Sequence, residues 1–258
     1  MDWSYDLLNP EEQTLLARLS VFKGGRTVDS TEPVCASSLQ IDVMDGLESL
    51  LNKNLLYQEH GLLGEPRFYM LETIHEYAQE KLVESGEADE FKLHHSQYFT
   101  SMAFEAEQKL YGPRQEYWLS KLRVEYDNLR TAMERSLDGP DVVLGYQIIG
   151  ALRYFWFSDG LIAEGFKWIE RALDSKVEIP LELRAKVYIT AADLSFIKGD
   201  KKKGKYFGGE ALDLSQASGD KLTHAWALVS LSKIFPLLET RFRTASNFVK
   251  KVWICSKI

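Results

Sequence analysis

The stretch RFYMLETIHEYAQEKL, residues 67–82, changes its hydrophobic period in the middle. Phe68 and Met70 alternate with more polar neighbours, which is typical of a half-buried strand. The apolar residues that follow have helical spacing, at Leu71, Ile74, Ala78 and Leu82. The stretch therefore predicts a strand that runs almost directly into a helix, and it is the joint between two different architectures.

Three helices and a hairpin are predicted before this joint. Asn9, Thr27 and Asp42 are suited to cap helices at about residues 10–23, 28–36 and 43–52. A strand at 55–59, a turn-rich tip at 60–66 and a return strand at 67–70 follow. This order predicts a winged-helix domain, a variant of the helix-turn-helix, over residues 1–85.

The charges of this domain oppose the usual function of a winged helix, which is to place its third helix in the major groove of DNA. That helix exposes Asp42, Asp45 and Glu48, and its only cation is Lys53. Residues 1–90 hold 18 Asp and Glu against 6 Lys and Arg, a net charge of −12, whereas residues 91–258 hold 20 and 25, a net charge of +5. The sequence favours a protein-packing role, and DNA binding by the winged helix or by basic clusters farther on is the alternative.

The rest of the chain, residues 86–258, is predicted to be an array of about four helix pairs. Helices are expected from about residue 88 to 110, at 114–137, 141–157, 161–174, 181–198, 201–216, 220–237 and 241–255. Phe157, Gly160 and Gly165 recur 39 residues later as Phe196, Gly199 and Gly204. This period predicts tetratricopeptide-like helical hairpins, and the fold class is therefore mainly α.

Such arrays form concave protein-binding surfaces, so the array predicts a partner site. The candidate residues are Tyr154, Trp156 and Trp168, with the basic residues Lys201, Lys202 and Lys203. The alternative is that the aromatic residues are interhelical core and that the lysines are a solvated helix face. A second basic cluster comprises Arg241, Arg243, Lys250 and Lys251. The chain ends in the apolar residues Val252, Trp253 and Ile254, which predict an edge that is exposed or is covered by a partner or by self-association with a second copy.

Three motifs carry a resemblance to a known family. They are residues 2–8 (DWSYDLL), residues 18–25 (RLSVFKGG) and residues 70–78 (MLETIHEYA). They resemble the bacterial STAND-class signalling ATPases, large regulators related to LuxR-type and AfsR-type transcription factors. The resemblance implies a winged helix that docks on a nucleotide-binding NB-ARC domain, followed by repeats that sense a partner protein or a small inducer.

The chain departs from that family in two ways. It has no GxxxxGK[ST] phosphate loop, so we expect no ATP hydrolysis and interpret the chain as the carboxy-terminal part of such a regulator or as a free-standing adaptor. The family also has a Met-His-Asp motif at the joint, where this chain has Met70, Leu71 and Glu72. Leucine cannot donate to a phosphate, so the joint is predicted to couple mechanically, through these three residues with Ile74 and His75.

No pattern in the sequence indicates catalysis, a metal or a cofactor. Adjacent His94 and His95 point about 100° apart on a helix and cannot readily share an ion. Cys35 and Cys255 have no metal-binding spacing and suggest a reducing compartment. With no apolar run of membrane-spanning length and no signal peptide, the expectation is a cytoplasmic, non-enzymatic regulatory protein that binds other proteins.

Overall fold

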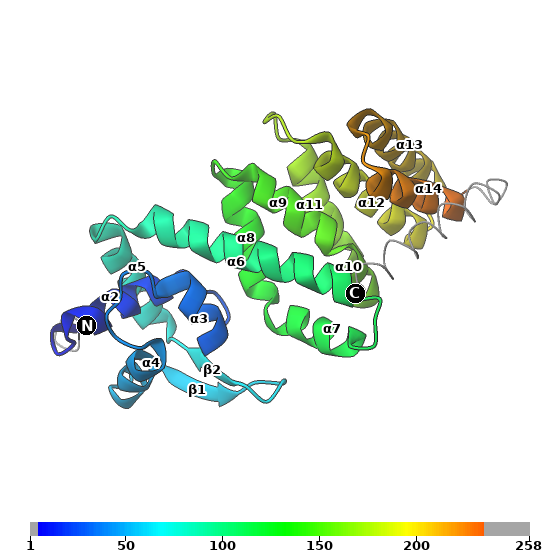
Figure 1. Cartoon of the computed structure of the whole chain (residues 1–258). Coiled ribbons are helices and arrows are strands. Elements are labelled where there is room, and N and C mark those ends of the chain that lie inside the picture. Colours follow the sequence, from blue (N-terminus) through cyan, green and yellow to red (C-terminus); the bar gives the residue numbers. More distant parts are fainter. Residues whose placement is uncertain (1–4, 235–258) are drawn as a thin grey trace. The chain divides into compact units, whose positions relative to one another are not determined.

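The computed structural model describes residues 5–234, and it divides the chain into two compact units, Met1–Arg135 and Ser136–Ile258 (Figure 1). The predicted helix at 241–255, the basic cluster at 241–251 and the apolar end at 252–254 lie outside the described residues.

The first unit begins with three helices, α2 (Pro10–Leu19), α3 (Val28–Cys35) and α4 (Val43–Asn52). The three predicted caps are confirmed: the side chains of Asn9, Thr27 and Asp42 accept hydrogen bonds from first-turn amides of α2, α3 and α4. Helix α2 ends four residues before the predicted end, because the amides of residues 20–22 bond three residues back and tighten the chain.

A two-stranded antiparallel hairpin follows, with β1 (Tyr57–His60) paired to β2 (Pro66–Tyr69). Arg26 bridges to Phe68 on the other side of β2, so the chain entering α3 lies along the inner edge of the hairpin. Only two residues separate β2 from α5 (Glu72–Glu84), which confirms the predicted passage from strand to helix. The hydrophobic core beneath these elements is formed by Leu15, Leu16, Leu19, Phe22, Leu47, Leu50, Phe68, Ile74, Ala78 and Leu82.

The first unit is completed by α6 (Ala88–Lys109), α7 (Gln115–Val124) and most of α8 (Tyr126–Asp138). Helix α6 packs against α3 of the winged helix and against α7. The prediction of one continuous helix over 114–137 is wrong at Glu125. The backbone of Glu125 leaves the helical region, with φ −94° and ψ 7°, so α7 ends there and α8 begins at the next residue. The side chain of Glu125, the residue at this break, contacts Arg67 and Asn128.

The second unit is all helical in its described part. It contains α9 (Val142–Ala151), α10 (Arg153–Ser158), α11 (Ile162–Leu173), α12 (Leu181–Ile197), α13 (Lys201–Ser218) and α14 (Lys221–Ile234). The predicted helix at 141–157 is interrupted at Leu152. Up to residue 234, the predicted helices at 161–174, 181–198, 201–216 and 220–237 lie close to the observed ones. Successive helices pack on one another, as Figure 1 shows for α12, α13 and α14.

Glycines allow close helix packing in this unit. A Cβ atom built on Gly165 of α11 would lie 2.7 Å from Leu194 of α12 and 3.0 Å from Trp156 of α10. On α13, a Cβ atom at Gly208 would lie 2.6 Å from Leu231 of α14. The small residue that the sequence repeat places at Gly165 is therefore required for packing, whereas the assignment to tetratricopeptide-like repeats stays a prediction.

Candidate functional site

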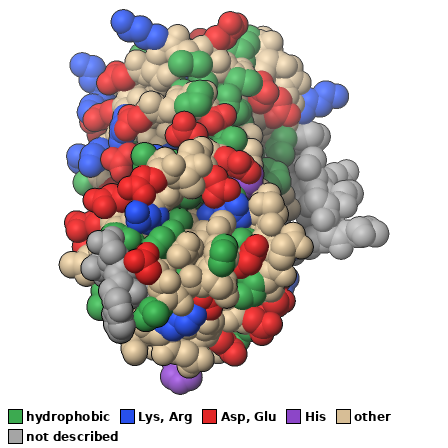
Figure 2. All heavy atoms as spheres, turned by 90° about the vertical axis from the view of Figure 1, so that its left-hand side faces the viewer, with side chains coloured by type: hydrophobic (Ala, Val, Ile, Leu, Met, Phe, Trp, Pro, Cys, Tyr) green, Lys and Arg blue, Asp and Glu red, His purple; other side chains and the backbone are tan. Residues whose placement is uncertain are grey.

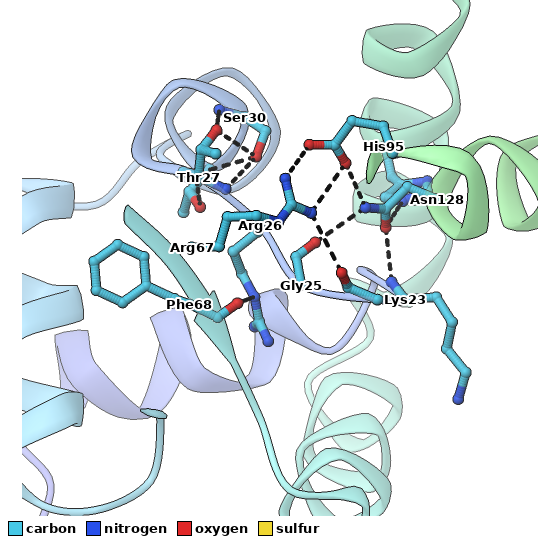
Figure 3. A network of polar contacts seen from close by, with 12 residues as sticks. Lys23, Gly25, Arg26, Thr27, Ser30, Arg67, Phe68, His95 and Asn128 are labelled. Carbon is cyan, nitrogen blue, oxygen red and sulfur yellow. Dashed lines mark hydrogen bonds and ion pairs between the residues drawn. The ribbon is translucent and has the colours of Figure 1, made fainter. Parts of the chain in front are cut away.

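The most elaborate polar cluster of the first unit surrounds the loop that joins α2 to α3 (Figure 3). Asn128 of α8 is at its centre. Its Oδ1 accepts a hydrogen bond from the amide of Lys23 at 2.7 Å and lies 3.3 Å from Nε2 of His95. Its Nδ2 donates to the carbonyl of Gly25 at 3.0 Å and to Glu125 at 2.8 Å. One amide side chain thereby ties the loop of the winged helix to α6 and α8.

Arg67 on β2 reaches the same cluster from the hairpin. Its guanidinium forms an ion pair with Glu125, the residue at the break between α7 and α8, and donates to the carbonyl of Gly24 at 3.3 Å. The side chains of Arg67 and Glu125 are only 4% and 6% exposed. Burial alone would lower the pKa of Arg67, but the carboxylate of Glu125 outweighs that effect and the pKa is raised. The helix break aims this carboxylate at both Arg67 and Asn128.

Two further side chains hold the loop. Nη1 of Arg135 donates to the carbonyl of Val21 at 2.9 Å, and Nε2 of His75 lies 3.1 Å from the carbonyl oxygen of Phe22. Five consecutive residues, 21–25, thus each have a backbone group in contact with a side chain from β2, α5 or α8. We call residues 21–25 the clamped loop. The clamping makes the winged helix and helices α6–α8 parts of one packed body.

Burial disfavours the charged form of two histidines of this body. Burial lowers the pKa of His95 to about 3, with the charge of Arg135 acting in the same direction and the contact with Asn128 opposing it. Burial also lowers the pKa of His75, against the opposing effect of its contact with Phe22. Neither ring is placed to act as a general base on a substrate, since both face backbone or amide groups of the core.

The five residues predicted to couple the joint have different positions. Ile74 and His75 are buried, and His75 reaches the clamped loop. Met70 is half-buried. Leu71 is 57% exposed and serves as the backbone cap of α5, and Glu72 forms a surface ion pair with Lys23 at 3.3 Å. Whether they transmit a signal stays a prediction. Sequence reasoning missed Arg67, Glu125 and Asn128, because Arg67 lies 58 positions before Glu125 in the chain.

The surface expected to read DNA in a winged helix is acidic in this one. Helix α4 exposes Met44, Asp45 and Glu48. The hairpin strand β1 is exposed along its whole length and carries Glu59. Figure 2 shows acidic side chains spread over the face that it draws, with Lys and Arg scattered between them and no continuous basic patch on the described part of that face.

The basic side chains of the winged helix also already have interaction partners within the protein. Residues 5–90 contain six, and five of them pair with carboxylates, as Arg18–Glu87, Lys23–Glu72, Lys53–Glu12, Arg67–Glu125 and Lys81–Glu84. The sixth, Arg26, is 2% exposed and donates to the backbone carbonyls of Leu19 and Phe68. A DNA-binding surface needs cations that can release counterions from phosphates. Each of these six already has an ion-pair or hydrogen-bond partner in the protein, and the pair of Lys23 with Glu72 lies at the surface.

A shallow cleft lies beside the hairpin, in the first unit. Its lining includes Thr27, Leu62, Arg67, Tyr98 and Lys121, and its interior volume is about 20 Å³. That volume accommodates about one water molecule and no nucleotide. Among residues 5–234, no group of three or more His, Cys, Asp or Glu is arranged to hold a metal ion.

The predicted partner residues of the second unit divide into two sets. Trp156 is completely buried and Trp168 is 5% exposed, so both indoles are core packing and not accessible surface. Tyr154 is half-buried, and Lys201, Lys202 and Lys203 are exposed on the first turn of α13. Only these latter residues can contact a partner without rearrangement of the helices.

An ion cluster in the second unit was not predicted. Asp193 of α12 pairs with Arg153 of α10 at 3.2 Å and with Lys233 of α14 at 2.9 Å. The guanidinium of Arg153 also lies 4.3 Å from the ring centre of Trp226. Three helices are thereby joined through one carboxylate that is 10% exposed.

Comparison with known proteins agrees with the fold of the first unit. Residues 8–83 match the winged helix-turn-helix domain family. The chain is 31% identical over 202 residues to proteins named "Putative HTH-type transcriptional regulator" from Mycobacterium tuberculosis and Mycobacterium bovis. The matched region covers 76% of this chain and 22% of those regulators, so the chain spans about a fifth of their length.

A shorter relative and the solved structures complete the comparison. An uncharacterized protein of Mycobacterium tuberculosis is 35% identical over 92 residues, covering 34% of this chain and 23% of that protein. No solved structure matches the chain significantly. Of the described helices, none has the length and apolar character needed to cross a membrane.

Proposed function

We propose that this chain is a non-enzymatic part of a transcriptional or signalling regulator, and that its winged helix docks on protein instead of reading DNA. The winged helix-turn-helix match and the names of the mycobacterial relatives support a regulatory role. The observation that carries the docking role is the occupation of all six basic side chains of residues 5–90. A surface whose few cations are already paired or hydrogen-bonded attracts the phosphate backbone only weakly.

The docking partner proposed for the winged helix is a nucleotide-binding domain of the NB-ARC type. This step rests on the resemblance of the three sequence motifs to STAND-class regulators. The helices after residue 86 would then bind a partner protein or a small inducer, and Tyr154 with Lys201, Lys202 and Lys203 are the accessible candidates for that contact. Binding there would shift the balance between closed and open states of the regulator.

DNA binding by the chain itself is the second candidate function. The family match and the relatives' names favour it, because winged helix-turn-helix domains commonly enter the major groove. The exposed lysines at the start of α13 are the described cations best placed to contribute.

Fluorescence anisotropy with a labelled random-sequence DNA duplex at about 50 mM and 200 mM salt distinguishes the two functions. The docking role predicts no binding tighter than about 100 μM at the higher salt, the weak limit of non-specific association. Salt-sensitive binding near about 1 μM would overturn it. In that case the triple change of Lys201, Lys202 and Lys203 to Glu, compared with Asp45→Ala on α4, would locate the DNA site.

A further inference from the structure

The outer edge of β1 has backbone groups without a strand partner. The hairpin pairs Tyr57 with Tyr69 and Glu59 with Arg67, and within residues 5–234 no other strand joins the sheet on the side of β1. Figure 1 draws β2 on the inner side of β1 and no further strand beyond it. A strand edge of this kind offers hydrogen bonds to an added strand.

The register decides which backbone groups point outward. The amide and carbonyl of Phe68 both bond to Arg26, on the side of β2 away from β1. In an antiparallel ladder successive residues bond to opposite sides, so Arg67 and Tyr69 bond to β1. The amide of Gly61, which donates to the carbonyl of Glu65 at 2.9 Å, continues the same alternation. The amides and carbonyls of the intervening residues on β1, Gln58 and His60, therefore face the open edge.

Features that normally block such an edge are nearly absent from β1. Its four residues, YQEH, are all exposed and include neither Lys nor Pro. Its short length is the remaining protection, and it still leaves two amides and two carbonyls available. The edge is therefore competent to pair with an extended segment of about four residues.

The side chains along the edge indicate the chemistry of that segment. Tyr57 is 41% exposed and stacks on Tyr69 with 5.3 Å between ring centres. Glu59 follows two residues later, so its side chain leaves the strand on the same face as that of Tyr57. An aromatic face and a carboxylate both attract a cation, through cation–π and charge interactions. Lys or Arg residues at alternate positions of an added strand would contact the ring of Tyr57 and the carboxylate of Glu59, respectively.

We propose that the β1 edge binds an extended, basic segment of a partner protein by strand addition, with backbone pairing at Gln58 and His60 and cationic side chains against Tyr57 and Glu59. This inference rests on the docking role proposed above and specifies the partner for one part of the winged helix. The two remain separable, because DNA binding tests the docking role and amide protection on β1 tests the inference.

The experiment uses the full chain and a capped nonapeptide in which arginine alternates with threonine. A second nonapeptide with glutamate in place of arginine is the matched probe. Hydrogen exchange followed by NMR is expected to show the amides of Gln58 and His60 slowed about tenfold or more by the arginine peptide. The glutamate peptide is expected to leave both unchanged, because it would face Glu59 with like charge.

Two variants test the mode of binding. Gln58→Pro removes one outward amide without removing a hydrogen bond to β2, and it is expected to weaken peptide binding about tenfold or more. Glu59→Lys keeps the backbone and is expected to reverse the preference between the two peptides. Glu90→Lys, an equal change of charge at an exposed site on α6, is the control and is expected to retain the preference for the arginine peptide. Protection at amides other than 58 and 60, or none with the arginine peptide, overturns the inference even where the chain binds no DNA.

Discussion

Arg67 on β2 and Glu125 between α7 and α8 form an ion pair that water hardly reaches, with side chains 4% and 6% exposed. The two residues are 58 positions apart in the chain. Their contact lies where a helix that the sequence predicts to be continuous is interrupted, and it buries the arginine of the wing. The hairpin and the break between α7 and α8 are therefore joined at this pair.

Removing one partner of the pair is expected to destabilise the first unit strongly. Glu125→Gln leaves the guanidinium of Arg67 buried without a counter-charge, a loss of about 3–5 kcal/mol in the free energy of unfolding. Urea denaturation measures it. The matched control is Glu116→Gln, which breaks the exposed pair with Arg123 and should cost about 0–1 kcal/mol. Similar losses for the two variants would contradict the role assigned to burial.

Asn128 is expected to be essential for the clamped loop. Asn128→Leu leaves the amide of Lys23 and the carbonyl of Gly25 without their side-chain partner, at a cost of about 2 kcal/mol or more. Hydrogen exchange at the Lys23 amide should accelerate much more than exchange at the caps of α4. The same substitution at the exposed Gln97 of α6 is the control, and a slow Lys23 amide in the Asn128 variant would show that the loop has other support.

The buried His95 predicts a loss of stability in mild acid. Its pKa is about 3 in the folded protein and about 6.5 in the unfolded chain, so below about pH 6.5 only the unfolded chain takes up the proton. The free energy of unfolding should therefore fall as the pH falls, by about 1.4 kcal/mol per unit well below pH 6.5 and down to about pH 3. Buried His75 acts in the same direction.

Denaturant titrations at pH 7 and pH 5 measure this effect. His95→Gln should reduce the difference in unfolding free energy between the two pH values by about 2 kcal/mol. An unaltered pH dependence in the His95 variant would mean that the imidazole is protonated in the folded state.

Substitutions at Gly25 and Gly64 can be compared to distinguish the cost of backbone strain from the cost of steric conflict. Both have positive φ, +89° and +84°, but a Cβ atom at Gly25 would lie 2.5 Å from the ring of Tyr69, whereas at Gly64 it would meet nothing within 4 Å. Gly64→Ala should cost about 1–2 kcal/mol from the left-handed backbone alone. Gly25→Ala should cost about 1–3 kcal/mol more, from displacement of the ring. Equal melting temperatures for the two variants would contradict this.

Local chemistry allowed much of the fold to be predicted. Asn9, Thr27 and Asp42 indicate three helix starts, because their side chains accept hydrogen bonds from amides only a few residues away. The change of hydrophobic period at residues 67–82 correctly predicts the strand-to-helix joint. These signals depend on near neighbours. They can therefore be read from a single sequence without knowledge of the three-dimensional structure.

The polar cluster could not be found in the same way. Glu125 sits inside a continuous amphipathic pattern, so nothing nearby marks it as a helix break or as the partner of Arg67. Trp156 is of a residue type that is common at binding surfaces. Only the packing of α10 against its neighbouring helices shows that it lies in the core. The positions of these residues depend on contacts with residues far away in the chain. A periodicity in the sequence does not indicate which distant side chain a residue will contact.

The distance between Arg67 and Glu125 along the chain has a consequence during protein synthesis. The winged-helix segment ends at Val83, and Glu125 is 42 positions later. At about 5–20 residues per second, a ribosome needs ~2–8 s to add that stretch. For this interval the nascent winged helix exists with an arginine that has no counter-ion and with a loop that lacks Asn128. Its folding is completed only when the following helices have emerged, and a chaperone that recognises incomplete domains has those seconds in which to act.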